Sequence, residues 1–198
     1  MVKKLLFFLL ISGFSFLKAQ ENPVDFISIP GPVELNATEF FLVNSKQFSK
    51  TYFRQQYLPA DQKVDDFNEL LDVSYFTKEI EMELAVRQKV ESVQQRESKD
   101  KFAKVNVTES PDGKEYIVDY YISESPEKGS PYIEYNIYRF KTIETGSGKN
   151  FLILNYAKRM YGDLKSSAKS IAKQRDNLMG AIIEFKVPEI KITDKAVR

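Results

Sequence analysis

Four strand-like segments follow one another between residues 103 and 158, and they constrain the fold more than any other part of the sequence. In the first segment, Ala103, Val105 and Val107 alternate with polar residues, which is typical of a half-buried strand. A turn with Pro111 and Gly113 follows it, and Gly accepts the positive φ that such turns need. The other three segments are residues 115–123, 132–141 and 151–158. Successive strands joined by short loops predict an antiparallel meander.

The N-terminal part of the chain predicts a strand and a hairpin. Residues 25–29 are expected to form a short first strand. Residues 38–43 and 48–58 are expected to pair as a hairpin that turns at Asn44-Ser45-Lys46. The next segment, residues 64–76, is ambiguous, because its apolar residues fit both a helical turn and a strand.

Two helices are predicted from apolar stripes with helical spacing. The first covers residues 77–100 and the second covers residues 164–185, where Pro188 prevents continuation. The predicted fold class is therefore α+β, with an antiparallel sheet made of the N-terminal hairpin and the four-stranded meander, packed with two main helices. We expect residues 21–198 to form a single domain. The order of these elements resembles that of the Mog1/PsbP-like sandwiches.

The first twenty residues predict export from the cytoplasm. Lys3 and Lys4 precede an apolar run over residues 5–17, and the small or polar residues Ala19 and Gln20 follow it. This is the pattern of a secretory signal peptide, because an apolar run of about thirteen residues is shorter than the roughly twenty that span a membrane. Cleavage after Ala19 or after Gln20 fits the pattern. The leader resembles those of exported Bacteroidota proteins of unknown function, which often end in Ala-Gln, and this implies a secreted or periplasmic protein with no transmembrane segment after cleavage.

The composition excludes several classes of site. The chain has no cysteine and no histidine, so it cannot form a zinc finger, a redox-active cysteine pair or a nucleophile activated by histidine. We expect no metal, no cofactor and no catalytic residue of a recognisable kind. The leader holds three of the 29 basic residues and none of the 28 acidic ones, so the remaining chain is slightly acidic. This charge gives no general attraction to nucleic acid.

A glycine-containing stretch, Thr145-Gly-Ser-Gly-Lys149, resembles a phosphate-binding loop but lacks parts of that motif. Position 143 is Ile where the motif needs Gly, and Asn150 stands where it needs Ser or Thr. A strand pattern rather than a helix follows. We therefore expect a hairpin turn here.

A basic stripe is predicted on the last helix, where Lys165, Lys169 and Lys173 lie four residues apart. Like charges at this spacing destabilise a helix slightly, so the stripe does not serve the stability of the helix. Two interpretations remain open: peripheral contact with an anionic surface, or a solvated face opposite the apolar stripe.

Tyrosine is concentrated in the meander, with six of the eleven tyrosines between Tyr116 and Tyr138. Alternation suggests that Tyr121, Tyr132 and Tyr138 share a sheet face with polar neighbours. Such a face would suit a ligand or a protein partner, because tyrosine offers a large contact area with a polar tip. The alternative is that a helix covers this face.

The functional hypothesis from sequence alone is an exported, non-enzymatic binding domain of the bacterial envelope, whose partner is an unknown protein or small ligand. One alternative is a small envelope enzyme that uses carboxylate and tyrosine groups. The other is a structural envelope component that touches an anionic surface through its basic helix.

Overall fold

The computed structural model describes residues 23–146 and 148–193. The predicted signal peptide and both of its predicted cleavage positions lie outside these residues. None of the helices in the described part of the chain is long and apolar enough to cross a membrane.

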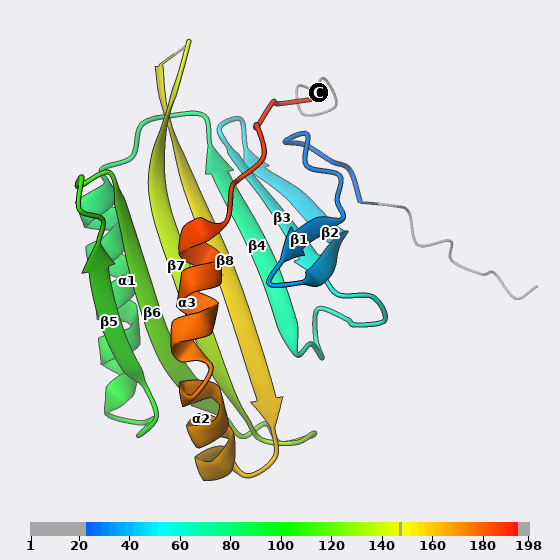
Figure 1. Ribbon diagram of the computed structural model, residues 1–198, viewed down its shortest axis with the longest axis vertical. Helices are drawn as coiled ribbons and strands as arrows, with labels where there is room; N and C mark the ends of the chain where they lie inside the picture. The colour runs from blue at the N-terminus through cyan, green and yellow to red at the C-terminus, as the bar shows by residue number, and fades with distance from the viewer. Residues whose placement is uncertain (1–22, 147, 194–198) are drawn as a thin grey trace, which may run out of the picture.

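Eight strands form one antiparallel, curled sheet in the order β1-β2-β3-β4-β8-β7-β6-β5 (Figure 1). The strands are β1 (Val33–Leu35), β2 (Thr38–Ser49), β3 (Tyr52–Leu58), β4 (Glu69–Phe76), β5 (Lys104–Glu109), β6 (Glu115–Glu124), β7 (Tyr132–Thr145) and β8 (Gly148–Tyr161). Each half of the chain thus contributes a four-stranded meander, and the two meanders join where β4 pairs with β8. The predicted α+β class is confirmed, but the predicted meander is one half of a single larger sheet.

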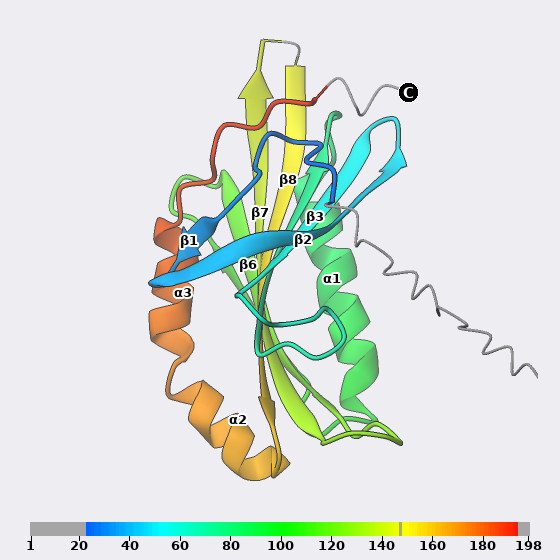
Figure 2. The ribbon, with the colours of Figure 1, turned by 90° about the vertical axis from the view of Figure 1, so that its right-hand side faces the viewer.

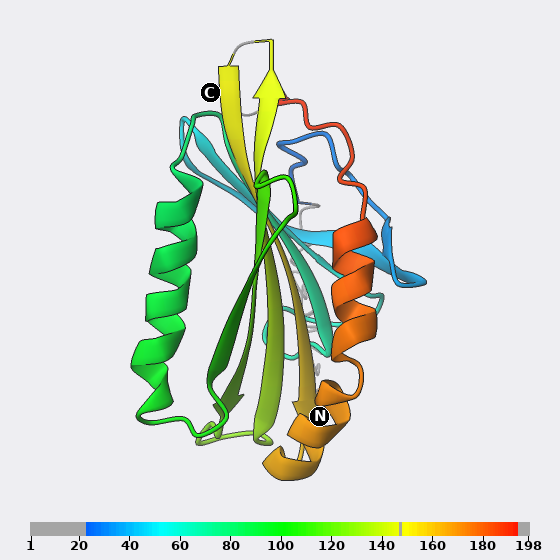
Figure 3. The same cartoon turned by 60° about the vertical axis from the view of Figure 1, so that its left-hand side comes forward.

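Helices cover both faces of the sheet. Helix α1 (Met82–Glu97) packs on β5, β6 and β7, whereas α2 (Leu164–Ala172) and α3 (Arg175–Glu184) pack on the opposite face against β7 and β8. Figure 3 shows α1 and α3 on the two sides of the sheet. One apolar core, which includes Ile137, Leu154 and Ile182, lies under α2 and α3, and a second lies under α1.

The second predicted helix is two helices. Asp163 caps α2 by accepting a hydrogen bond from the backbone N–H of Ser166 at 2.9 Å, and α2 ends at Ala172, with Lys173 as its C-cap. Helix α3 then starts at Arg175, whose side chain binds the buried Asp119 of β6. The break lets this arginine reach the sheet while Ile171 of α2 and Leu178 and Ile182 of α3 are buried in the core.

Three boundaries in the N-terminal half differ from the prediction. The hairpin turns at Lys50-Thr51, because β2 continues through the polar residues 44–46, which pair with Arg54, Gln55 and Gln56 of β3. Residues 69–76 of the ambiguous segment form strand β4. The first helix starts at Met82 rather than Thr77, because the backbone N–H of Thr77 donates to Thr51 at the end of the hairpin.

Residues 25–29, predicted as a strand, belong to no strand of the sheet. Side chains bind their backbone instead: Gln55 accepts from the N–H of Phe26 at 2.6 Å, and Asp25 accepts from the N–H of Ile29 at 3.0 Å. The segment lies beside the C-terminal segment (Figure 2), where the N–H of Lys191 donates to the carbonyl of Ile27 at 3.2 Å. Backbone hydrogen bonds therefore connect the N-terminal and C-terminal segments of the described chain.

Candidate functional site

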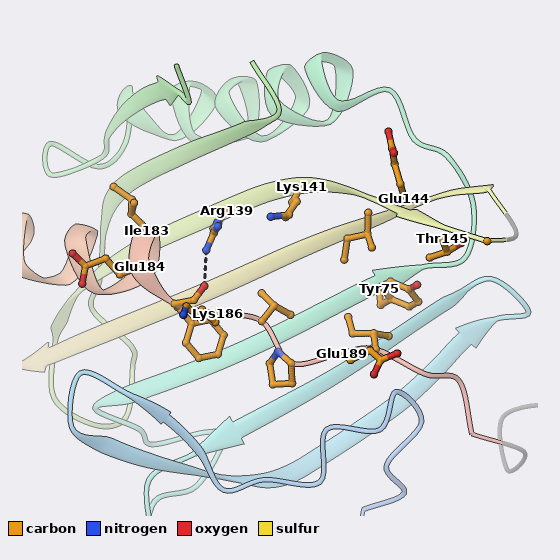
Figure 4. Close-up of a pocket in the computed structure, with 15 residues that line it drawn as sticks. Tyr75, Arg139, Lys141, Glu144, Thr145, Ile183, Glu184, Lys186 and Glu189 are labelled. Carbon is orange, nitrogen blue, oxygen red and sulfur yellow. Dashed lines mark hydrogen bonds between the residues drawn. The ribbon is translucent and has the colours of Figure 1, made fainter. Parts of the chain in front are cut away.

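A cleft of about 700 Å³ lies between the sheet and the segment that follows α3 (Figure 4). Strands β4 and β7 supply its floor, and residues 183–190 supply the opposite wall. Its apolar lining is formed by Tyr75, Ile143, Ile183, Phe185, Val187, Pro188 and Ile190. The side chain of Ile183 is 52% exposed, so α3 presents an apolar residue to the opening rather than to the core.

Arg139 in the middle of β7 holds one end of the cleft together. Its guanidinium donates to the carbonyl oxygens of Ile182 and Phe185, at 3.0 and 2.8 Å, and these are carbonyls of the last turn and C-cap of α3. A cation at this place also suits the negative end of the helix dipole. The same guanidinium donates to Glu115 of β6 at 2.6 Å. These hydrogen bonds from Arg139 connect the wall of the cleft to its floor.

Glu115 is shared by two cations, because Lys141 also donates to it. Burial alone would raise the pKa of the Glu115 carboxyl, but the hydrogen bonds from Arg139 and Lys141 outweigh burial and lower it. This carboxylate is therefore ionised and paired, and it is not available as a general acid or base.

The remaining ionisable groups of the cleft lie at its rim. Glu144, Glu184, Glu189 and Lys186 are exposed. At the floor, Tyr75 is buried, and its hydroxyl accepts a hydrogen bond from the Asn150 side chain at 2.6 Å. No buried carboxylate lines this cleft within the described residues, and its basic and acidic side chains balance.

The three candidate tyrosines do not share a surface. Tyr121 pairs in register with Tyr135 and stacks on its ring at 4.6 Å, on the face that α2 and α3 cover. Tyr132 and Tyr138 lie on the other face of β7, and all three are half-buried. The prediction of one shared exposed face is therefore wrong. Tyr121 pairs with Tyr135, on the opposite face of the sheet from Tyr132 and Tyr138, and helices cover both faces. Alternation along a strand does not show which of its faces is exposed to solvent.

The two tyrosines on the α1 face also have different neighbours. Tyr132 packs against the guanidinium of Arg159, 4.5 Å from its ring centroid. Tyr138 lies under α1, where the Lys89 ammonium is 4.0 Å from its ring centroid. Each of these two rings thus packs against a cation of the same chain.

The basic stripe is exposed, as both of its interpretations require. Lys165 and Lys169 lie on α2, and Lys173 is the C-cap residue of that helix. The glycine-containing stretch is the hairpin of β7 and β8, as predicted, with Thr145 and Gly148 as register partners.

Sequence reasoning missed the cleft and its central residue, Arg139. A signal was present: this arginine stands between apolar residues of a predicted strand, and a buried arginine needs partners. Those partners, the last carbonyls of α3, come from a segment more than forty residues away, so the sequence could not show them.

A family model matches residues 27–187, which is most of the described chain, and the family is one of uncharacterised proteins. The chain belongs to this family. The match includes the sheet, all three helices and most of the cleft lining, so the fold and the cleft belong to the region that defines the family. No curated protein and no solved structure matches the chain.

Proposed function

We propose that this protein is an exported, non-enzymatic binding domain of the bacterial envelope, and that the cleft beside α3 binds a ligand with a largely apolar, uncharged body. The observation that carries this proposal is the lining of the cleft. Apolar side chains line it, and its one deeply placed charge, Arg139, is already bound to Glu115 and to α3. Such a lining gives contact area to a ligand and offers no reactive group to a substrate.

The balance of charge among the lining residues supports an uncharged ligand body. Arg139, Lys141 and Lys186 are matched in number by three glutamates at positions 144, 184 and 189. A lining with balanced charges gives no net attraction to an anion or a cation. Affinity must therefore come from burial of apolar area, at about 25 cal/mol for each Å² removed from water.

The proposal is tested with N-phenyl-1-naphthylamine, an uncharged apolar dye whose fluorescence rises when it leaves water. The protein is expected to bind it, and Ile183→Gln combined with Val187→Gln is expected to weaken binding about tenfold, or about 1.4 kcal/mol. The matched control is Leu84→Gln, which removes a similarly exposed apolar residue from α1. Equal dye binding by the double variant and the wild type would contradict the proposal, and so would an equal loss in the control.

A further inference from the structure

A row of polar side chains crosses the centre of the sheet on the face where α1 lies. Gln56, Asp72, Asn155 and Tyr138 stand at directly opposite register positions on β3, β4, β8 and β7. We call these four residues the polar row. Helix α1 packs mainly on β5, β6 and β7, and strands β8, β4 and β3 lie to the side of it in the sheet (Figure 1).

The polar row is buried but not fully hydrogen-bonded. Gln56, Asp72 and Asn155 are only 8%, 4% and 7% exposed. Asp72 accepts from Gln56 at 3.0 Å and from the guanidinium of Arg54 at 2.6 Å. In contrast, the side-chain oxygen of Asn155 has no hydrogen-bond partner among the described residues. Buried carbonyl oxygens are nearly always paired, so this one lacks a donor that the chain does not supply.

A lysine from α1 reaches the same place. Lys89 lies on the inward stripe of the helix, between Val86 and Val93, where an apolar residue is the rule. Its ammonium lies 4.0 Å from the ring centroid of Tyr138. Within residues 23–146 and 148–193, no carboxylate lies within salt-bridge distance of it.

The charges around the polar row leave one positive charge without a match. Arg54 and Lys89 flank the single carboxylate of Asp72, and Arg54 already binds that carboxylate. Burial lowers the pKa of Lys89, and the nearby Arg54 lowers it further, against the opposing effect of Asp72. Lys89 is partly buried and contacts the rings of Tyr138 and Tyr120, but it has no anionic partner among the described residues. A partly desolvated cation without an anion is unfavourable to a fold, and a chain keeps such a group where it has another use.

The two unmet groups define the chemistry of a ligand. Lys89 lacks an anion and Asn155 lacks a hydrogen-bond donor, and Tyr138 is the neighbour of both. The side chain of Arg54, which binds Asp72, is 40% exposed, so solvent reaches the polar row from the side of Arg54.

We propose that Lys89 and the polar row bind a small carboxylate that also carries a hydroxyl or amino donor. The carboxylate binds the ammonium of Lys89, and the hydroxyl or amino group donates to the side-chain oxygen of Asn155. This site lies on the opposite face of the sheet from the cleft beside α3. It is therefore independent of the function proposed for that cleft.

Matched pairs of acids test the two contacts separately. Lactate and 3-hydroxybutyrate carry the donor, and propionate and butyrate are the same acids without it. In titrations followed by NMR of backbone amides, at least one hydroxy acid is expected to bind at least fivefold more tightly than its partner acid. Asn155→Leu is expected to remove this preference, whereas Lys89→Met is expected to remove binding of all four. Inorganic phosphate as a fifth probe shows whether any anion suffices, and binding of phosphate as tight as that of the hydroxy acids would overturn the proposal. Absence of binding by all four acids, or binding that Lys89→Met leaves unchanged, would also overturn it.

The melting temperature of a Lys89 variant distinguishes a lysine kept for ligand binding from a lysine that stabilises the fold. If Lys89 is there for a ligand, Lys89→Met removes an unpaired desolvated cation and is expected to raise the melting temperature by about 2–4 °C. The matched control is Arg87→Met, which removes an exposed cation from the same helix and is expected to leave it within about 1 °C. A lower melting temperature for Lys89→Met than for the wild type would show that the lysine stabilises the fold and would refute the proposal.

Discussion

Replacing Arg139 with Met tests how α3 and the wall of the cleft are held. The change removes the donor to two carbonyl oxygens at the C-terminal end of α3, and it leaves Glu115 with one cation instead of two. Met keeps much of the volume of the arginine stem, so packing changes little. The effect should therefore come from lost charged hydrogen bonds.

The expected cost follows from the contacts. Water can replace part of each lost bond, because the carbonyls face a cleft, so we assign about 1 kcal/mol to each of them. The partly buried contact with Glu115 adds about 1 kcal/mol. Arg139→Met should therefore lower the free energy of unfolding by about 3 kcal/mol, a large part of the 5–15 kcal/mol typical of a domain. Urea denaturation measures this value.

Lys141→Met is the matched control for this prediction. Lys141 binds the same glutamate, but its side chain is 38% exposed against 11% for Arg139, and its only salt bridge among the described residues is to Glu115. Its loss should cost less than about 1 kcal/mol. If both variants lose equal stability, Arg139 does not hold α3, and the reasoning fails.

The stability of Arg139→Met should also depend on pH differently from that of the wild type. The pKa of Glu115 is lower in the folded protein than its ordinary value, so this carboxylate stabilises the fold above its unfolded pKa. That stabilisation disappears as the pH falls through the folded value. Arg139→Met should therefore lose less stability than the wild type when the pH falls from about 5 to about 3.

Three further predictions address other parts of the chain. Arg175→Met should cost about 2–4 kcal/mol in urea denaturation, because it leaves the fully buried Asp119 without its cation, and a loss below about 1 kcal/mol would contradict this. Because burial lowers the pKa of Lys89 in the folded protein, and Arg54 lowers it further against the opposing effect of Asp72, the stability of the wild type should rise relative to that of Lys89→Met as the pH moves from about 8 to about 10; parallel curves would contradict it. Mass spectrometry of the exported protein should find a chain that begins at Gln20 or Glu21, and an intact Met1 would contradict export by this leader.

The meander from β5 to β8 was predictable because each strand carries its own signal. In β5, Val105 and Val107 alternate with polar residues, and Gly113 marks the turn to β6. These signals depend on neighbours in sequence, and the antiparallel pairing of consecutive strands follows from the short loops between them. The pairing of β4 with β8 could not be predicted in this way, because it joins residues 75 to 89 positions apart, from Phe76 with Phe151 to Glu69 with Lys158.

The faces of the strands were not predictable, because both are buried. A strand of a half-exposed sheet alternates between apolar and polar residues, but β7 is covered on both sides and carries paired charges on both of them. Glu134 is 9% exposed, and its carboxylate accepts from Arg159 at 2.6 Å. From the sequence, such a residue looks like a solvent-facing acid. This is why the tyrosines beside it were placed on an exposed face.

The candidate sites were missed for a related reason: a buried polar residue in a strand looks the same whether or not it has a partner. Asp72 and Asn155 each interrupt an apolar strand, and that interruption was the available signal. Only the structure shows that Asp72 is paired and that the oxygen of Asn155 is not.

Pairing also separates structural from functional polar groups in the finished fold. On the α2 and α3 face, Asp119 is fully buried, but Arg175 and Tyr135 satisfy its charge and its oxygens, so nothing there calls for a ligand. The hydroxyl of Tyr121 nearby has no hydrogen-bond partner among the described residues, but it is neutral, and a single water molecule would satisfy it. The α1 face differs, because there Lys89 has no anionic partner and the side-chain oxygen of Asn155 has no donor among the described residues, and both groups lie beside Tyr138. Water can satisfy the oxygen but brings no negative charge, and it is this unmatched charge that makes an anionic ligand the simplest complement of the site.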